Sequence, residues 1–471
     1  MLISDKGAEN VAENKMGVMP VNKLILNMSL PMMLSMLVQA LYNIVDSVFV
    51  GMLSEEALTA VSLSFPAQNL MIGVATGTGV GINALVSRSL GEKNFDKVHK
   101  LAQNGVFLAF MSFVAFFIFG IFGAEAFMRS QTDVEEIVQY GTSYLRVCCC
   151  ASLGVYFEIT FERLLQSTGR TVYTMCTQGV GAIVNIILDP IFIFSSEESF
   201  LGFGLGMGVT GAAVATVSGQ IVAGVIAVIL NAKKNPEVKV DFRKFRPDGK
   251  LIGQIYKIGV PSIIMVAIGS VMTYCMNKIL ILYTPGKETS ATVFGAFFKL
   301  NSFICMPIFG LNNGVIPIIA YNYGARNRDR MLKTVKLTAI YAEIFSIMGA
   351  VLFLTIPDKL LGFFSASPAM LEIGIPALRI IGSSFTFAGI CIALGAAFQA
   401  LGKSFLSMLV SLIRQLLVLT PVAFFLARYG MTVGNPDLVW WSYPVAEVTS
   451  LIVSIACFVY VYKTVISKIK N

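Results

Sequence analysis

Charged residues are scarce in this sequence of 471 residues. Only 13% of the residues are Asp, Glu, Lys or Arg, whereas soluble proteins average about 25%, and 56% are hydrophobic. The mean hydropathy of +0.75 and the length of the apolar runs exclude an ordinary soluble enzyme. Lys and Arg (35) outnumber Asp and Glu (27), but they lie in short loops between apolar runs. The excess therefore indicates membrane topology, with the lipid bilayer as the surroundings and no nucleic-acid partner.

Residues that bind metals or form disulfides are few or badly placed. The one histidine, His99, lies in a charged loop beside Lys97 and Lys100, without a second ligand near it in the sequence. The eight cysteines lie inside apolar runs with no CxxC spacing, so we interpret them as reduced packing residues. The sequence also lacks a GxxxxGK[ST] phosphate loop and a nucleophile paired with a base. We therefore expect no enzyme activity, no ATP-driven transport and no bound cofactor.

Long apolar runs are the main feature that the sequence does have. A membrane-spanning helix needs about 20 mostly apolar residues, and runs of this length recur between polar or Gly- and Pro-rich breaks. They predict an all-α, multi-pass membrane protein with twelve transmembrane helices. The predicted spans are 24–50, 57–87, 101–124, 137–165, 171–194, 208–231, 251–283, 290–320, 334–356, 374–400, 405–427 and 440–463.

Basic residues fall almost entirely on one side of these spans. Residues 1–23 contain no apolar region followed by a cleavage site, so no signal peptide is predicted and the N-terminus stays in the cytoplasm. The loops after even-numbered spans are then basic, as cytoplasmic loops should be. Both termini are predicted to be cytoplasmic, in the inner (plasma) membrane of the cell. The basic loop residues on the outer side are Arg129, Lys287, Lys359 and Arg428.

The two halves of the sequence are related by an internal repeat. Six spans per half is an even number, so the repeat is parallel, about an axis along the membrane normal. We interpret the repeated glycines as residues that let helices approach closely. A shift of 233 residues superposes small and polar residues of the two halves: Gly77 on Gly310, Gly81 on Gly314, Gly91 on Gly324, Asn94 on Asn327 and Gln166 on Gln399.

One long polar connection separates the halves. The predicted domains are a cytoplasmic tail at 1–23, an N-lobe of six helices at 24–232, a cytoplasmic linker at 233–250 and a C-lobe of six helices at 251–471. Transporters built from such repeats bind their substrate between the lobes.

Two carboxylates inside the spans of the first half break the repeat. An ionised acid at the centre of a bilayer costs about 2.5–3.5 kcal/mol on insertion scales. The presence of Asp46 and Asp189 inside spans therefore requires an explanation. Asn185 precedes Asp189 by one helical turn and shares its face, and Pro190 is expected to kink this span. If both acids face one pocket, either one is protonated or a cation binds between them. The alternative is a buried ion pair with Arg146, Lys278 or Lys299.

Further polar residues are candidates for lining a substrate cavity. Gln39 and Tyr42 precede Asp46 in the first span, and Glu158 lies in the fourth. Glu162, one turn from Glu158, is beside Arg163 at the inner end of that span and is expected to be solvated or paired. In the repeat, Lys299 corresponds to Pro66 of the first half. The long aliphatic side chain of Lys299 can bring its ammonium group to a substrate or a carboxylate.

Several motifs, in order along the whole chain, resemble the multidrug and toxic compound extrusion (MATE) family and its DinF- and MepA-like branch. They are Pro31, Asp46 followed by VFVG, RSLGEKN, LQSTGR, NIILDPIFIF and GVTGAAVAT. The resemblance implies a V-shaped pair of bundles that exports small organic, often cationic, compounds, including antibiotics, in antiport with Na⁺ or H⁺. It also implies a cation site, open to Na⁺, at Asp46, Asn185 and Asp189, with Thr216 of the sixth span.

The C-lobe departs from the branch of the family that carries acids in spans 7 and 10. Here those spans show Asn277, Lys278, Arg379 and Cys391, so no ion site is expected in the C-lobe. A related function, flipping a lipid-linked oligosaccharide, remains an alternative because that substrate carries a pyrophosphate. Such a pyrophosphate would be bound by positive charge inside the membrane. The basic residues available for this are Arg146, Lys278, Lys299, Arg379 and Arg414. We expect a monomer.

Overall fold

The computed structural model describes residues 14–196, 203–243, 245–284, 287–364 and 366–469. Within these ranges the chain is helical, with one isolated β-bridge between Ser195 and Leu205. The helices of the first half are α1 (Lys15–Val18), α2 (Val21–Gly51), α3 (Glu55–Gly91), α4 (Phe95–Phe122), α5 (Ala124–Arg129), α6 (Glu135–Cys150), α7 (Leu153–Ser167), α8 (Thr171–Ile193) and α9 (Gly208–Lys234).

The second half repeats this order. Its eleventh span is interrupted by a π-helical segment, Ile413–Leu419, and its twelfth begins with a 3₁₀ turn, Pro436–Trp441. The helices are α10 (Gly249–Tyr283), α11 (Lys287–Gly324), α12 (Arg328–Thr355), α13 (Pro357–Gly362), α14 (Pro368–Ala400), α15 (Ser404–Leu412), α16 (Thr420–Val433) and α17 (Ser442–Thr464).

The predicted all-α fold of twelve spans is confirmed. Eleven helical segments of the described chain are long and apolar enough to cross a membrane, and the bent pair α6 and α7 makes the twelfth. The chain is therefore a multi-pass membrane protein. Most helices extend past the predicted limits, because Ser, Asn and Asp caps begin them in the loops, as Asn94 does for α4 and Asn327 for α12.

The fourth span differs from the single helix predicted at 137–165. It breaks between α6 and α7, whose axes differ by 46°. At the break the backbone changes to tighter contacts, in which the amides of Ser152 and Gly154 donate to the carbonyls of Cys149 and Ala151. The hydroxyl of Ser152 also donates to the Cys149 carbonyl at 2.7 Å and so adds a side-chain hydrogen bond at the break.

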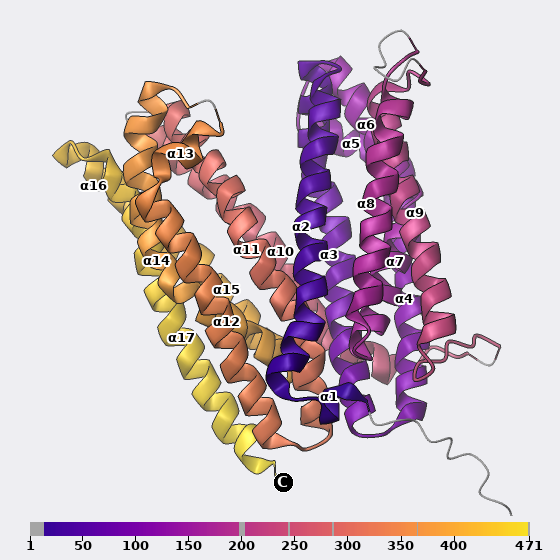
Figure 1. Cartoon of the computed structure of the whole chain (residues 1–471). Coiled ribbons are helices and arrows are strands. Elements are labelled where there is room, and N and C mark those ends of the chain that lie inside the picture. Colours follow the sequence, from indigo (N-terminus) through magenta and orange to yellow (C-terminus); the bar gives the residue numbers. More distant parts are fainter. Residues whose placement is uncertain (1–13, 197–202, 244, 285–286, 365, 470–471) are drawn as a thin grey trace, which may run out of the picture.

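The helices form two bundles that converge at one end and diverge toward the other (Figure 1). We call α2–α9 the N-lobe and α10–α17 the C-lobe. α1 and the end of α17 lie where the bundles converge, and we name this the closed end (Figure 1). The opposite end, where the bundles are apart, is the open end. The lobes meet through their first two long helices, α3 against α10 and α11 against α2.

The glycines of the internal repeat lie at this contact between the lobes. A Cβ atom on Gly310 would meet the Met33 Cα at 2.5 Å, and one on Gly314 would meet the Ser29 Cα at 2.6 Å. The equivalent glycines of α3 contact α10 in the same way: Gly77 at Gly259 and Ile263, and Gly81 at Ile255. Their role in helix packing is thus confirmed, and the two contacts are related as a two-fold axis between the lobes requires.

The segment around α1 crosses the closed end and binds both lobes. On the C-lobe side, the Arg330 guanidinium donates to the carbonyls of Met16 and Met19, at 3.0 and 2.6 Å. On the N-lobe side, the Asn14 amide donates to the Thr168 carbonyl at 3.1 Å. We call residues 14–20 the N-terminal clasp, because they join the two lobes where these converge.

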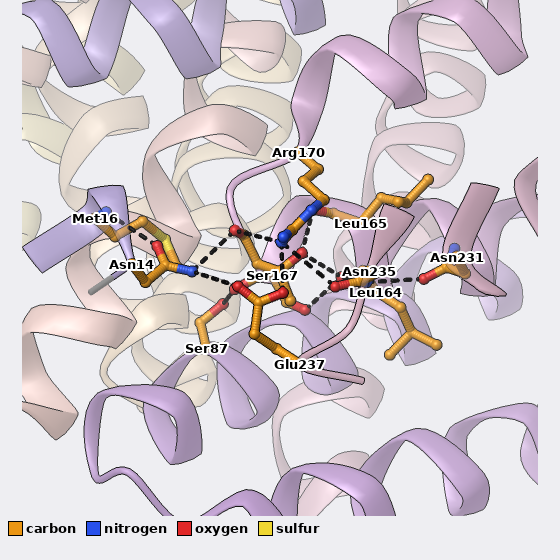
Figure 2. A network of polar contacts seen from close by, with 11 residues as sticks. Asn14, Met16, Ser87, Leu164, Leu165, Ser167, Arg170, Asn231, Asn235 and Glu237 are labelled. Carbon is orange, nitrogen blue, oxygen red and sulfur yellow. Dashed lines mark hydrogen bonds and ion pairs between the residues drawn. The ribbon is translucent and has the colours of Figure 1, made fainter. Parts of the chain in front are cut away.

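The linker after α9 completes the clasp on the N-lobe side. Glu237 forms an ion pair of 2.7 Å with Arg170 and accepts a hydrogen bond from Asn14 (Figure 2). Asn235 donates to the Leu164 carbonyl at 3.2 Å, which ties the linker to the end of α7 (Figure 2). The closed end is thus held by a polar network as well as by glycine packing.

Arg330→Ala should loosen the closed end. Losing hydrogen bonds from a charged donor costs about 1–3 kcal/mol, enough to shift a two-state equilibrium roughly tenfold. In a Cys176→Ser background, a Ser29→Cys probe at the lobe contact should react about tenfold faster with a water-soluble maleimide. Lys333→Ala removes an exposed charge from the same helix and should leave the rate unchanged. Equal rates in the two variants would contradict a role for the clasp.

Candidate functional site

Three predicted residues meet where α8 packs on α9. The Asn185 amide donates to Asp189 Oδ1 and to Thr216 Oγ1, each at 3.4 Å. The two helices approach this closely because each has a glycine at the contact. A Cβ on Gly219 would lie 2.6 Å from the Gly181 carbonyl oxygen. A larger side chain at either glycine would separate Asn185 from Thr216.

Asp46 lies on α2, which packs against α8. Its carboxylate lies close enough to that of Asp189 for the two to repel each other. Asp189 is fully buried, and Asn185 is 2% exposed. Three oxygens in this group have no donor among the described residues: Asp46 Oδ1, Asp189 Oδ2 and Asn185 Oδ1.

Buried acceptors without donors are costly, at about 1–3 kcal/mol each. A proton or a small cation between the two acids would remove both the repulsion and the missing contacts. Carboxylate and amide oxygens are suitable ligands for a hard cation, and a carboxylate also takes a proton. The chemistry of this group therefore fits the predicted cation site, whether the ion is H⁺ or Na⁺.

The alternative of a buried ion pair does not form in the described part of the chain. None of the ion pairs found there includes Asp46 or Asp189. Arg414 of the C-lobe pairs with Glu447 at 3.0 Å. The other intramembrane basic residues have exposed side chains: Arg146, Lys278, Lys299 and Arg379.

Both acids lie close to the ends of their helices at the open end. Asp46 precedes the end of α2 by five residues, and Asp189 precedes the end of α8 by four. Pro190 is in the last turn of α8, which continues to Ile193, so its missing backbone donor lies near the end of the helix. The site is thus within about two helical turns of the ends that both helices have at the open end.

A cavity of about 80 Å³ extends from this group into the N-lobe. It is large enough for several water molecules, because one needs about 10–15 Å³. Five predicted residues line it: Gln39, Tyr42, Glu158, Asn185 and Thr216. Lys299 does not, because it is on α11 of the other lobe, where its side chain is exposed. Asp46 and Asp189 lie beside the cavity.

Residues that the sequence did not single out extend the polar region toward the closed end. Gln178 and Gln220 also line the cavity. Gln178 Nε2 donates to Glu162 Oε2 at 2.8 Å, and Thr177 Oγ1 lies 2.6 Å from Glu162 Oε1. The sequence placed Glu162 beside Arg163 at the end of its span, as a paired or solvated acid. It is instead 2% exposed and bound by two residues of α8, which no spacing within one helix reveals.

Comparison with known proteins agrees with the repeat and the fold. The family model described as MatE matches residues 31–191 and 261–425, two segments that begin at the repeated prolines Pro31 and Pro261. Two proteins named multidrug export protein MepA are similar over most of the chain. The one from Staphylococcus haemolyticus is 28% identical over 428 residues, 90% of each chain, and the one from Staphylococcus aureus strain N315 is 26% identical over 430 residues, 91% of each.

A solved structure has the same architecture. It is described as the outward-facing conformation of a multidrug resistance MATE family transporter of the MOP superfamily. Its TM-score is 0.88 at 25% identity, over 97% of this chain and 100% of that one.

Proposed function

The chain belongs to the MatE family, and we propose that this multidrug efflux transporter exports small organic compounds in exchange for a cation bound at Asp46, Asn185 and Asp189. The observation that carries the site is the set of three buried oxygens without donors among the described residues, on Asp46, Asp189 and Asn185. The coupling ion is H⁺ or Na⁺. Thr216 contributes by orienting Asn185, to which it is hydrogen-bonded.

The orientation in the membrane follows from the basic loops. In this proposal the protein lies in the plasma membrane with both termini in the cytoplasm, so the closed end faces the cytoplasm and the open end faces outward. Residues 24–232 and 251–471 are the two units that move, joined by the linker 233–250. The monomer is the working unit.

Coupling requires that the ion bind the two orientations of the transporter with different affinity. Helix α2 provides a direct connection, because it carries Asp46 near its outer end and contacts α11 through Ser29 and Met33. A cation between Asp46 and Asp189 draws α2 toward α8. The same movement changes the contact of α2 with Gly310 and Gly314, and hence the position of the C-lobe.

The substrate is bound between the lobes in this proposal. Gln39, Tyr42 and Glu158 present polar groups in the N-lobe cavity. Lys299, on α11 of the C-lobe, adds an exposed basic side chain. Flipping of a lipid-linked pyrophosphate has less support, because Glu447 neutralises Arg414, one of the cations that it would use.

Transport driven by imposed gradients tests the proposal. Purified protein in liposomes should move the fluorescent organic cation ethidium at least about tenfold faster when an inward H⁺ or Na⁺ gradient is imposed than without one. Each gradient is applied separately, with the membrane potential clamped by K⁺ and valinomycin. The absence of gradient-driven transport under both conditions would rule out the antiporter.

A further inference from the structure

A second pair of acids lies on α7, one helical turn apart, between the cation site and the closed end. Glu158 lines the N-lobe cavity, and Glu162 is buried beneath it. The two carboxyl groups are close enough to interact electrostatically, and no ion pair in the described ranges includes either. Two neighbouring carboxylates inside a membrane bundle are costly to keep ionised together.

The contacts of Glu162 fit a carboxyl group that gains and loses a proton. Thr177 Oγ1 lies 2.6 Å from Glu162 Oε1 and 2.8 Å from the Thr174 carbonyl oxygen. The hydroxyl has one proton, so it can donate to only one of them. If Glu162 is protonated, it donates to Thr177 Oγ1, which donates to Thr174, and both contacts are satisfied. If Glu162 is ionised, Thr177 turns its proton toward the carboxylate.

A polar route connects this pair to the cation site. Asn185, Glu158 and Gln178 line the same cavity, and Asn185 Oδ1, almost fully buried, has no donor among the described residues. Tyr42 lies within electrostatic range of Glu158, Asp46 and Asp189. From Asp189 to Gln178 the route covers eleven residues of α8, about 16 Å. The cavity has room for the water molecules that a proton needs to cross it.

We propose that Glu158 and Glu162 carry the coupling proton from the Asp46 and Asp189 site through the inner half of the N-lobe. This rests on the proposed antiporter and selects H⁺ as its ion. A proton leaves the Asp189 carboxyl group, crosses the cavity water to the Glu158 carboxylate and passes to Glu162, and no other bond changes. Within the described chain, the titratable and charged groups that interact with the pair are Tyr42, which is within electrostatic range of Glu158, and Arg163, which is within range of Glu162.

Arg163 joins this proton route to the contact between the lobes. It follows Glu162 on α7, and its Nη1 donates to Gln166 Oε1 at 2.9 Å and to Asn313 Oδ1 of α11 at 3.0 Å. An ionised Glu162 attracts this guanidinium and competes with Asn313 for it. Loss of the proton from Glu162 therefore weakens a contact that holds the lobes together.

Glu162→Gln in liposomes tests the proposal. It should lower ethidium transport driven by a pH gradient at least about tenfold, because the amide cannot take up a proton. Exchange of ethidium across the membrane without a gradient should persist, which shows that the variant is folded. Thr177→Val, which removes the relay hydroxyl at similar volume, should reduce the pH-driven rate in the same direction, and Thr177→Ser should restore it. Glu372→Gln, at an exposed acid of α14, is the matched control.

The outcomes separate this inference from the proposed function. Wild-type rates under a pH gradient in both Glu158→Gln and Glu162→Gln would overturn the proton route and leave the antiporter intact. Transport driven by Na⁺ and not by the pH gradient in the wild type would do the same. Failure of the wild type under both gradients would instead remove the antiporter itself.

Discussion

Asp189→Asn is expected to abolish efflux driven by an ion gradient, with a loss of about 100-fold. The amide is nearly isosteric with the carboxylate and keeps an oxygen within reach of Asn185, so the packing of α8 on α9 should survive. It carries no negative charge, so it neither takes up a proton nor attracts a cation. The energetic difference between the ion-bound and ion-free orientations is then lost.

The measurement is ethidium transport in liposomes under the gradient that drives the wild type. Asp133→Asn, at an exposed acid in the loop before α6, is the control and should behave as the wild type. Ethidium binding by Asp189→Asn should stay within a few-fold of the wild type, since the carboxylate acts on the ion in this mechanism. Full gradient-driven efflux by this variant would show that the cation site is elsewhere.

Gly314→Leu should force the lobes apart at the closed end and stop transport. A Cβ at this position lies 2.6 Å from both the Cα and the Oγ of Ser29, and a backbone Cα cannot move without shifting α2. Overpacking of this kind costs about 1–3 kcal/mol, which lowers the population of the conformation seen here roughly 5- to 150-fold. By the symmetry of the repeat, Gly81→Leu should have the same effect.

The change can be measured as a distance between spin labels at positions 100 and 333, one exposed lysine in each lobe near the closed end. The wild type should give mainly short distances, and Gly314→Leu longer ones. The control is Gly295→Leu on the same helix, because a Cβ there meets no atom within 4 Å. If both leucine variants gave the wild-type distances, the glycine contact would not hold the closed end.

Much of this architecture could be predicted because lipid imposes strong rules on sequence. Each span must be long and apolar, so hydropathy alone locates twelve spans, and the basic loops predict their orientation. The repeated glycines stand out since a close contact between helices tolerates no side chain. Asp46 and Asp189 stand out because a charge in the bilayer is costly, and the structure brings Asp189 to Asn185 and within electrostatic range of Asp46.

The rest depends on contacts between distant segments. Glu162 looked like a surface acid, because its neighbour Arg163 suggested a pair in solvent, whereas Thr177 and Gln178 of another helix bind it. The break in the fourth span could not be predicted from a proline, because the sequence has none there. The clasp binds through the Asn14 side chain and through the backbone carbonyls of Met16 and Met19, and its partners, Thr168 and Arg330, are far along the chain.

The contact between the lobes also has a consequence for synthesis. The ribosome makes the N-terminal half first, so α2 and α3 enter the membrane before α10 and α11 exist. Until then the grooves at Gly77 and Gly81 face lipid instead of Gly259 and Ile255. The nascent N-terminal half therefore exposes the glycine grooves of α3 to lipid. These grooves are filled only when the C-terminal half has been inserted.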